Sequence, residues 1–205
     1  MEASYLSSDG TLDATAREYW TLIRQRAGIS TNFEQTIAAT DMSKEAENDW
    51  GAYTGGQVIA DKTLYNIRRE RRCEFLAEGL RYMDLRRWRA MDQLITSPAH
   101  LEGMHLWNTP MEKWYLNNEG KSILIADGTN NSNVSSKERS EYLRPFEKNP
   151  SQAAYDGCTW KMAHYLSPIM VKQFQLTATS GADVSTSVLY QNPYWPVVAD
   201  KPAEK

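Results

Sequence analysis

One stretch, residues 61–94, constrains the fold more than any other: DKTLYNIRRERRCEFLAEGLRYMDLRRWRAMDQL. It mixes charged and apolar residues, contains no proline, and is typical of an α-helix along its whole length. Gly79 costs about 1 kcal/mol inside a helix, so a kink or a break into two helices is expected near it. The apolar residues fall on two nearly opposite helix faces, which predicts packing between neighbours. The first face carries Leu64, Ile67, Phe75, Tyr82 and Leu85, and the second carries Cys73, Leu76, Leu80, Met83, Met91 and Leu94.

A strip of charged residues separates these two faces. Helix residues three apart are neighbours, so Arg81 is expected to pair with Glu78 and Asp84. Charges beside packed surfaces are expected to be paired and largely buried, because a buried charge without a partner is costly. We therefore interpret the strip as structural and expect its tryptophan in the core; the strip comprises Glu70, Arg71, Glu74, Glu78, Arg81, Asp84 and Trp88.

Other local signals predict shorter elements. Residues 13–27 have apolar residues at helical spacing, with Thr15 and Glu18 in capping-box relation and Gly28 as the stop. The acidic residues 40–49 suggest a short helix, and the helical pattern ends at Ser97-Pro98. The segment 123–126, ILIA, is compatible with a short strand.

The last third of the chain is rich in proline, which excludes long helices. One short helix is expected there, with Ser167 as its cap, Pro168 at its first position, and an apolar side made by Met170 and Phe174. The segment QNPYWPVV, residues 191–198, is expected to be extended, with its aromatic rings packed back onto the helices.

Three motifs, taken together, resemble a known family. ERRCEFLAEGLRYMDLRRW (70–88), EYWTLIRQRAG (18–28) and QNPYWP (191–196) are similar to signatures of the SusD/RagB family of nutrient-binding outer-membrane lipoproteins. YLSPI (165–169) is also similar, although Met170 stands where that family usually has proline, and Tyr194 where it usually has glycine. The resemblance spans most of the chain, and because family members are usually more than twice as long, it implies a C-terminal portion.

The resemblance implies a mainly α fold with a loop-rich second half. Residues 1–28 would end a TPR-like helical-repeat region, and residues 29–205 would form a SusD-like C-terminal domain. The implied function is non-enzymatic binding of glycans or other nutrients and their delivery to a SusC-like TonB-dependent transporter. The implied location is the cell surface of the bacterial outer membrane, reached through a lipid anchor that this chain lacks. The N-terminal half of the same protein is a further implied partner, because the apolar side of residues 13–27 would otherwise lack cover.

Composition agrees with this reading and excludes some classes. With 205 residues, a net charge of −3 and a pI near 5.7, the chain lacks the basic character typical of nucleic-acid-binding domains. No segment has the apolar length of a membrane span, and residues 1–13 lack a signal-peptide pattern, so an exported form would have lost its signal and lipid-bearing cysteine. Cys73 and Cys158 are far apart in sequence, which favours free thiols, with Cys73 buried.

No catalytic constellation stands out. The histidines are dispersed, and only Glu102 and His105 have a spacing that could share a metal ion, so neither a metal nor a cofactor is predicted. The carboxylates of residues 61–94 could supply the acid and base of a glycosidase, but neighbouring arginines would lower their pKa values and work against a general acid. An α-helical glycoside hydrolase and a purely structural interaction module remain as alternatives.

Aromatic residues are the best candidates for ligand contact. The chain has seven tryptophans and eleven tyrosines, and several lie in expected loops. A ring on a fixed loop can cover the apolar face of a sugar, although such rings also anchor loops to helices. The candidates are Trp107, Trp114 and Tyr115, which cluster in sequence, together with Trp50 and Tyr53.

Overall fold

The computed structural model describes residues 1–181 and 183–204, and the chain forms two compact units. Unit 1 is Met1–Gln93 and unit 2 is Leu94–Lys205. The predicted mainly α fold is confirmed. The predicted domain boundary after residue 28 stays a prediction, and the core of unit 1 draws on residues from both sides of it. Within the described residues, no helix combines the length and apolarity needed to cross a membrane.

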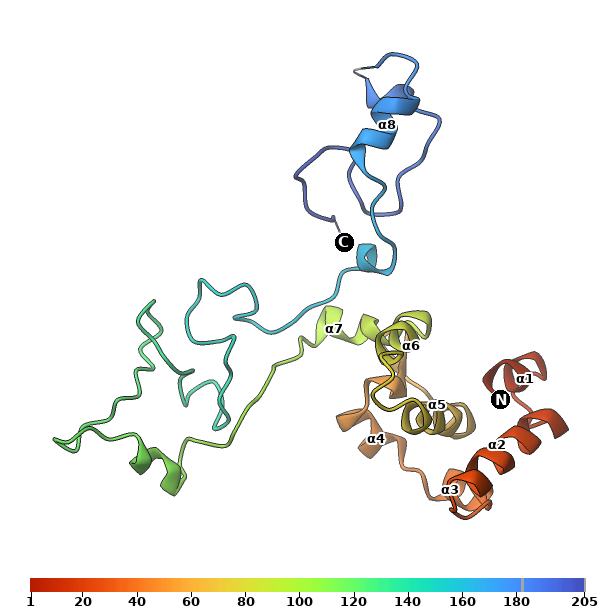
Figure 1. The fold of residues 1–205 in the computed structure, drawn as a ribbon, viewed down its shortest axis with the longest axis horizontal. Coiled ribbons are helices and arrows are strands. Elements are labelled where there is room, and N and C mark those ends of the chain that lie inside the picture. The colour runs from red at the N-terminus through yellow and green to blue at the C-terminus, as the bar shows by residue number, and fades with distance from the viewer. Residues whose placement is uncertain (182, 205) are drawn as a thin grey trace. The chain divides into compact units, whose positions relative to one another are not determined.

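Unit 1 is helical apart from one small hairpin, in which β1 (Tyr53–Thr54) pairs antiparallel with β2 (Gln57–Val58). The longest helices are α2 and α5, and α5 contacts both α1 and α3 (Figure 1). The helices are α1 (Glu2–Ser7), α2 (Ala14–Arg26), α3 (Phe33–Ala39), α4 (Met42–Asn48), α5 (Lys62–Glu74), α6 (Arg81–Arg87) and α7 (Gln93–Thr96), the last crossing the unit boundary, and short 3₁₀ helices lie at Trp50–Ala52 and Ala90–Asp92.

The core of unit 1 joins helices that are distant in sequence. Tyr5, Trp20, Phe33 and Ile67 form one buried cluster, and the rings of Trp20 and Phe33 stack with their centroids 4.5 Å apart. The hydroxyl of Tyr5 donates to Asp61 at 2.7 Å, and Asp61 also accepts the backbone N–H groups of the first turn of α5. Burial, together with the neighbouring Asp61 carboxylate, raises the pKa of Tyr5 to about 12. These contacts fix the start of α5 against α1.

The α2 helix is confirmed, but its cap differs from the prediction. Asp13, rather than Thr15, caps it, because the Asp13 side chain accepts the N–H of Ala16 at 2.8 Å. Gly28 ends the helix with φ +68°, a conformation that glycine adopts without strain.

The buried side of α2 is not wholly apolar. Ala16, Trp20 and Arg24 are buried, whereas Tyr19 and Leu22 are about half exposed. Arg24 is buried because its guanidinium forms an ion pair with Glu70 at 3.0 Å, which satisfies its charge inside the unit.

Residues 61–94 form α5, α6, the 3₁₀ helix Ala90–Asp92 and the start of α7 rather than one helix. The expected break is confirmed: α5 ends at Glu74, α6 starts at Arg81, and Ala77 and Gly79 between them have φ of +66° and +74°. An uninterrupted helix is therefore wrong. The break also changes the predicted faces, since α6 no longer continues the rotation of α5. Ile67, Leu85, Met91 and Leu94 are buried as predicted, but Leu76 and Met83 are 78% and 66% exposed, and Cys73 is exposed rather than buried.

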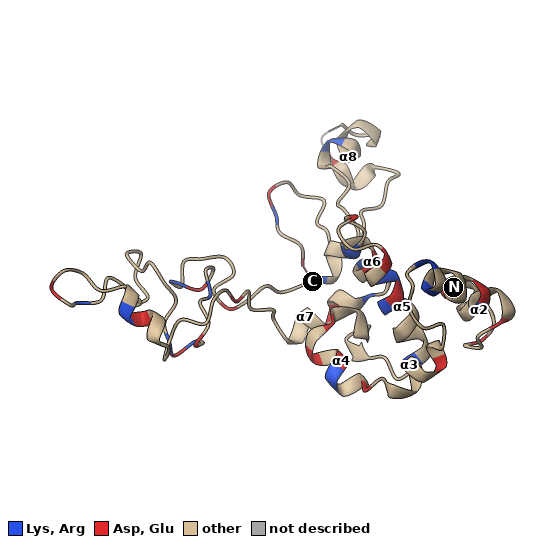
Figure 2. Cartoon of the chain, turned by 60° about the horizontal axis from the view of Figure 1, so that its bottom comes forward, with Lys and Arg blue, Asp and Glu red and all other residues tan. Residues whose placement is uncertain are grey.

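The charged strip is paired, but mostly with other partners than predicted. Arg81 pairs with Asp49, and Asp84 accepts from Arg71 at 2.7 Å, because the break places α6 beside a different part of unit 1. The expected pairs of Arg81 with Glu78 and Asp84 are wrong, and Glu78 is exposed. Figure 2 shows the acidic and basic residues next to each other on α5 and α6. The remaining carboxylates pair with α2, as Glu70–Arg24 and Glu74–Arg26, and Trp88 is buried in the core as predicted.

Unit 2 is rich in loops, as predicted. Its α8 (Val171–Thr177) starts later than expected, so Pro168 precedes the helix, Ser167 does not cap it, and Met170 is exposed while Phe174 is buried. Short 3₁₀ helices lie at Pro110–Trp114, Met162–Tyr165 and Val184–Thr186. In the described part of unit 2 the strand pairing consists of isolated bridges, so the strand expected at 123–126 is wrong.

The segment 191–198 is not extended as expected, because Pro193 and Tyr194 form a turn, but the ring of Trp195 packs onto the 3₁₀ helix Met162–Tyr165. The Gln191 side chain accepts the N–H of Ile169 at 2.8 Å and donates to its carbonyl at 2.9 Å, and the indole of Trp195 donates to Ala163 at 2.9 Å. Tyr194 has φ +66°, a conformation in which glycine would be unstrained.

Candidate functional site

Two segments of unit 2, residues 99–107 and 139–147, pair with each other and hold several polar and aromatic side chains in place. The backbone N–H of Gly103 donates to Leu143 at 2.7 Å, the N–H of Leu143 donates to Met104 at 2.9 Å, and the N–H of Leu106 donates to the Glu141 carbonyl at 3.1 Å. His105 and Tyr142 face each other across this ladder as an antiparallel bridge. Residues nearly forty positions apart are thus brought into one surface.

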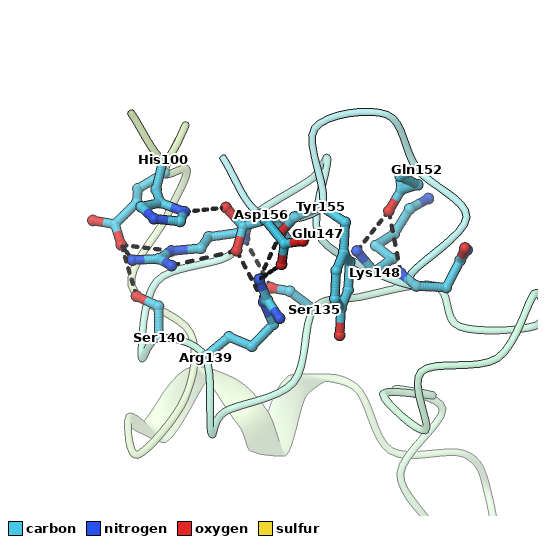
Figure 3. Close-up of polar contacts among 12 residues, drawn as sticks. His100, Ser135, Arg139, Ser140, Glu147, Lys148, Gln152, Tyr155 and Asp156 are labelled. Carbon is cyan, nitrogen blue, oxygen red and sulfur yellow. Dashed lines mark hydrogen bonds and ion pairs between the residues drawn. The ribbon is translucent and has the colours of Figure 1, made fainter. Parts of the chain in front are cut away.

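A buried carboxylate holds these segments together (Figure 3). Glu147 is 2% exposed and accepts from Nδ1 of His100 at 2.6 Å, from Nε of Arg139 at 3.0 Å and from Arg144 at 3.3 Å. Burial alone would raise the pKa of Glu147, but the hydrogen bonds from His100 and the two arginines outweigh it and hold the pKa below its usual value. Glu147 is therefore a structural anion.

Glu102 continues this network toward solvent. Arg144 donates to one oxygen of Glu102 through Nε at 2.9 Å and through Nη2 at 2.8 Å, and the Ser140 hydroxyl donates to the same oxygen at 2.8 Å. The hydrogen bond from Ser140 and the ion pair with Arg144 lower the pKa of Glu102. Glu102 and His105, which have a spacing that could share a metal ion, have other partners: Glu102 pairs with Arg144, and His105 with Glu141. Across the described residues no group of three or more histidine, cysteine or acidic side chains is placed to hold a metal ion.

His105 instead pairs with Tyr142 and Glu141. The rings of His105 and Tyr142 stack with centroids 4.6 Å apart and an interplanar angle of 16°. Nε2 of His105 lies 3.1 Å from one carboxylate oxygen of Glu141, and the Asn108 side-chain amide donates to the other at 2.8 Å. These two bonds, that of Asn108 first, lower the pKa of Glu141. A flat aromatic pair with an ionised carboxylate at its edge can take up a ligand that has both an apolar face and hydroxyl groups.

Sequence reasoning missed Glu141, Tyr142 and Asn108. The pairing of residues 99–107 with 139–147 is a long-range contact between irregular segments, and it leaves no periodic pattern in either. Of the three, only Tyr142 could have been identified as a candidate from the sequence, because it is an aromatic residue in a proline-containing loop.

The three clustered candidate residues lie in different environments. Trp107 is 8% exposed, and its indole donates to the carbonyl of Ser135 at 3.0 Å, so this ring lies in the core of unit 2. Trp114 is 73% exposed at the end of the 3₁₀ helix Pro110–Trp114, and Tyr115 next to it is half-buried. Of the three, Trp114 offers the most ring surface to a ligand.

The other two candidates belong to unit 1. Trp50 is 37% exposed in the 3₁₀ helix Trp50–Ala52, and the hydroxyl of the half-buried Tyr53 donates to the Ala46 carbonyl at 3.3 Å. A role for either ring in ligand binding stays a prediction.

Comparison with known families decides the membership of this chain. The family model described as the SusD family matches residues 2–195. The chain belongs to the SusD family. Neither the curated proteins nor the solved structures gave a match. SusD family proteins are generally binding proteins rather than enzymes; they are associated with nutrient and glycan uptake, normally work with SusC-like transporters, and are typically outer-membrane-associated lipoproteins.

Proposed function

We propose that this protein binds glycans or other nutrients at the surface of the bacterial outer membrane and delivers them to a SusC-like TonB-dependent transporter. The observation that carries the proposal is the SusD family match over residues 2–195. A lipid anchor would hold the protein at the membrane.

The carboxylates of unit 2 favour binding over catalysis. A glycosidase that works near neutral pH needs a carboxylic acid with a raised pKa to protonate the leaving group. Glu102, Glu141 and Glu147 all have pKa values below the usual range, through hydrogen bonds that stabilise the charged form. Their environments thus suit acceptors of hydrogen bonds better than general acids.

A binding screen tests the proposal. Purified protein is exposed to panels of neutral and acidic oligosaccharides and of peptides, with isothermal titration calorimetry on each hit. We expect at least one nutrient to bind without being cleaved. Release of reducing sugar by the purified protein would instead support the α-helical glycoside hydrolase.

Transporter delivery requires a separate measurement. We expect the lipid-anchored protein to co-purify with a SusC-like transporter from outer-membrane vesicles. Retained co-purification without binding of any screened ligand would support the alternative of a purely structural interaction module.

A further inference from the structure

The His105–Tyr142 ring pair is exposed although it is held in place on several sides. Tyr142 is 43% exposed, and the side chain of His105 is also 43% exposed. Because the two rings stack on each other, what each leaves exposed is an outer face or an edge. Flat, exposed aromatic area of this kind binds ligands with little loss of side-chain entropy.

The carboxylate beside the rings has unused capacity to accept hydrogen bonds. An ionised carboxylate has about four acceptor positions. Glu141 uses one on His105 and one on Asn108, and its side chain is 52% exposed. Hydroxyl groups of a ligand resting on the rings could therefore donate to Glu141 without displacing its present partners.

The backbone fixes this arrangement before any ligand binds. The Glu141 carbonyl accepts the N–H groups of Leu106 at 3.1 Å and Trp107 at 3.0 Å, and the ring of Trp107 is buried. The nearby turn is fixed too, since the N–H of Asn108 donates to the Glu112 carboxylate. A site that is already ordered loses less free energy on binding than one that must be ordered.

We propose that His105, Tyr142, Glu141 and Asn108 form a binding site for an uncharged sugar residue. The apolar face of the sugar lies on the rings, and its hydroxyls donate to Glu141. Glu141 and Glu112 place two carboxylates around Asn108, so a uronic acid in the same position would bring a third negative charge beside them. Glu141 thus selects neutral sugars over acidic ones. This inference rests on the proposed function, because it names the ligand class of a nutrient-binding protein.

Calorimetry with matched oligosaccharides tests the site. The full chain is titrated with galacto-oligosaccharides or gluco-oligosaccharides, and with the uronate oligomers of the same sugars, at neutral pH. We expect a neutral series to bind with a Kd about tenfold or more below that of its uronate counterpart. Glu141→Gln should narrow this difference, because the amide keeps the shape but removes the charge. Tyr142→Ala should weaken binding of the neutral series about tenfold.

Matched variants separate the site from general effects of substitution. Tyr190→Ala removes a tyrosine that is 90% exposed elsewhere in unit 2, and Glu138→Gln removes an exposed carboxylate close to Glu141 in sequence. Both should leave binding unchanged. If Tyr142→Ala does not fold, Glu141→Gln still decides the question.

The outcomes distinguish this inference from the function it rests on. Equal affinity for both series, or binding unchanged in Tyr142→Ala and Glu141→Gln, would overturn the site while leaving nutrient binding intact. Absence of binding by every neutral and acidic oligosaccharide would overturn both the site and the proposal that glycans are the nutrient.

Discussion

The guanidinium of Arg81 forms an ion pair with Asp49, 32 residues earlier in the chain. Asp49 is 5% exposed, and it also pairs with Arg72 at 2.6 Å and accepts from the Tyr65 hydroxyl at 3.1 Å and from the Gly51 N–H at 2.8 Å. One buried carboxylate therefore connects the segment before the hairpin with both α5 and α6.

Arg81→Ala is expected to destabilise the protein by about 2 kcal/mol, the usual effect of removing a hydrogen bond to a charged group. Arg72 stays on Asp49, so the loss should be smaller than the roughly 3 to 5 kcal/mol typical when a buried charge loses its only partner. Urea unfolding measures the change. Arg17→Ala is the control, since its pair with Glu34 is about half exposed and should contribute under about 1 kcal/mol. Equal effects of the two substitutions would show that Asp49 does not depend on Arg81.

Trp107→Ala should lower stability, whereas Trp114→Ala should not. Trp107 is buried, so its truncation should cost about 3 to 5 kcal/mol of unfolding free energy. Trp114 is 73% exposed, so its truncation should leave stability nearly unchanged, and any effect should appear in ligand affinity. Thermal melts and calorimetry on the same samples separate the two. A large loss of stability in Trp114→Ala would mean that this ring packs in the folded protein.

The lowered pKa of Glu147 predicts that the protein loses stability in acid. Its pKa in the folded protein lies below its ordinary value of 4.5, so its charged form contributes stability that is present above pH 4.5 and is lost as the pH falls through the folded pKa. Glu147→Gln should therefore be less stable than the parent at neutral pH, by about 2 kcal/mol, and the two should converge as the pH falls through the folded pKa of Glu147. Glu119→Gln, at an exposed position, should follow the parent throughout. A constant difference across this pH range would contradict the assignment of Glu147 as an ionised anchor.

Unit 1 is expected to associate through its apolar surface. A groove of about 470 Å³ is lined partly by Tyr19, Leu22 and Phe75, and a second hollow of about 370 Å³ lies beside Leu76 and also contacts Phe75. Exposed apolar patches of this kind are uncommon on monomers and mark interaction surfaces. We expect the chain to self-associate at micromolar concentration.

Sedimentation velocity with two substitutions tests this expectation. Leu22→Glu and Leu76→Glu, at residues that are 51% and 78% exposed, should abolish association without unfolding the chain. Leu176→Glu, on a leucine of α8 that is 68% exposed, serves as the control. A parent chain that stays monomeric at micromolar concentration would contradict the prediction.

Local sequence signals predicted the elements they act on directly. The spacing of apolar residues and the glycine at position 28 predicted α2, and the acidic segment predicted α4. Gly79 predicted the break in the central stretch, because glycine is unfavourable inside a helix, and its observed φ is +74°. Such signals act over a few residues and do not depend on the rest of the fold.

Contacts between distant segments could not be predicted in this way. The ion-pair partner of Arg81 depends on where the break directs α6, and helical spacing alone pointed to Glu78 and Asp84. Trp107 and Trp114 carried the same sequence signal, yet Trp107 is buried, with its indole N–H donating to the distant Ser135 carbonyl, and Trp114 is exposed. The family itself was recognisable, because its motifs are read residue by residue without knowledge of the contacts they make.

The turn between α5 and α6 gives the spacing of the charged motif a different meaning. Arg71 reaches Asp84 across this turn, 13 residues along the chain, while Ala77 within it takes a left-handed conformation that disfavours residues other than glycine. In a straight helix that separation would set the number of helical turns between the two side chains, whereas here it sets the length of the turn that joins α5 to α6. Replacing a residue of this turn leaves its length unchanged. Ala77→Gly would relieve the strain of the left-handed conformation at position 77. A single insertion or deletion between residues 75 and 80 would carry Asp84 away from Arg71, so relatives should vary there in composition but not in length.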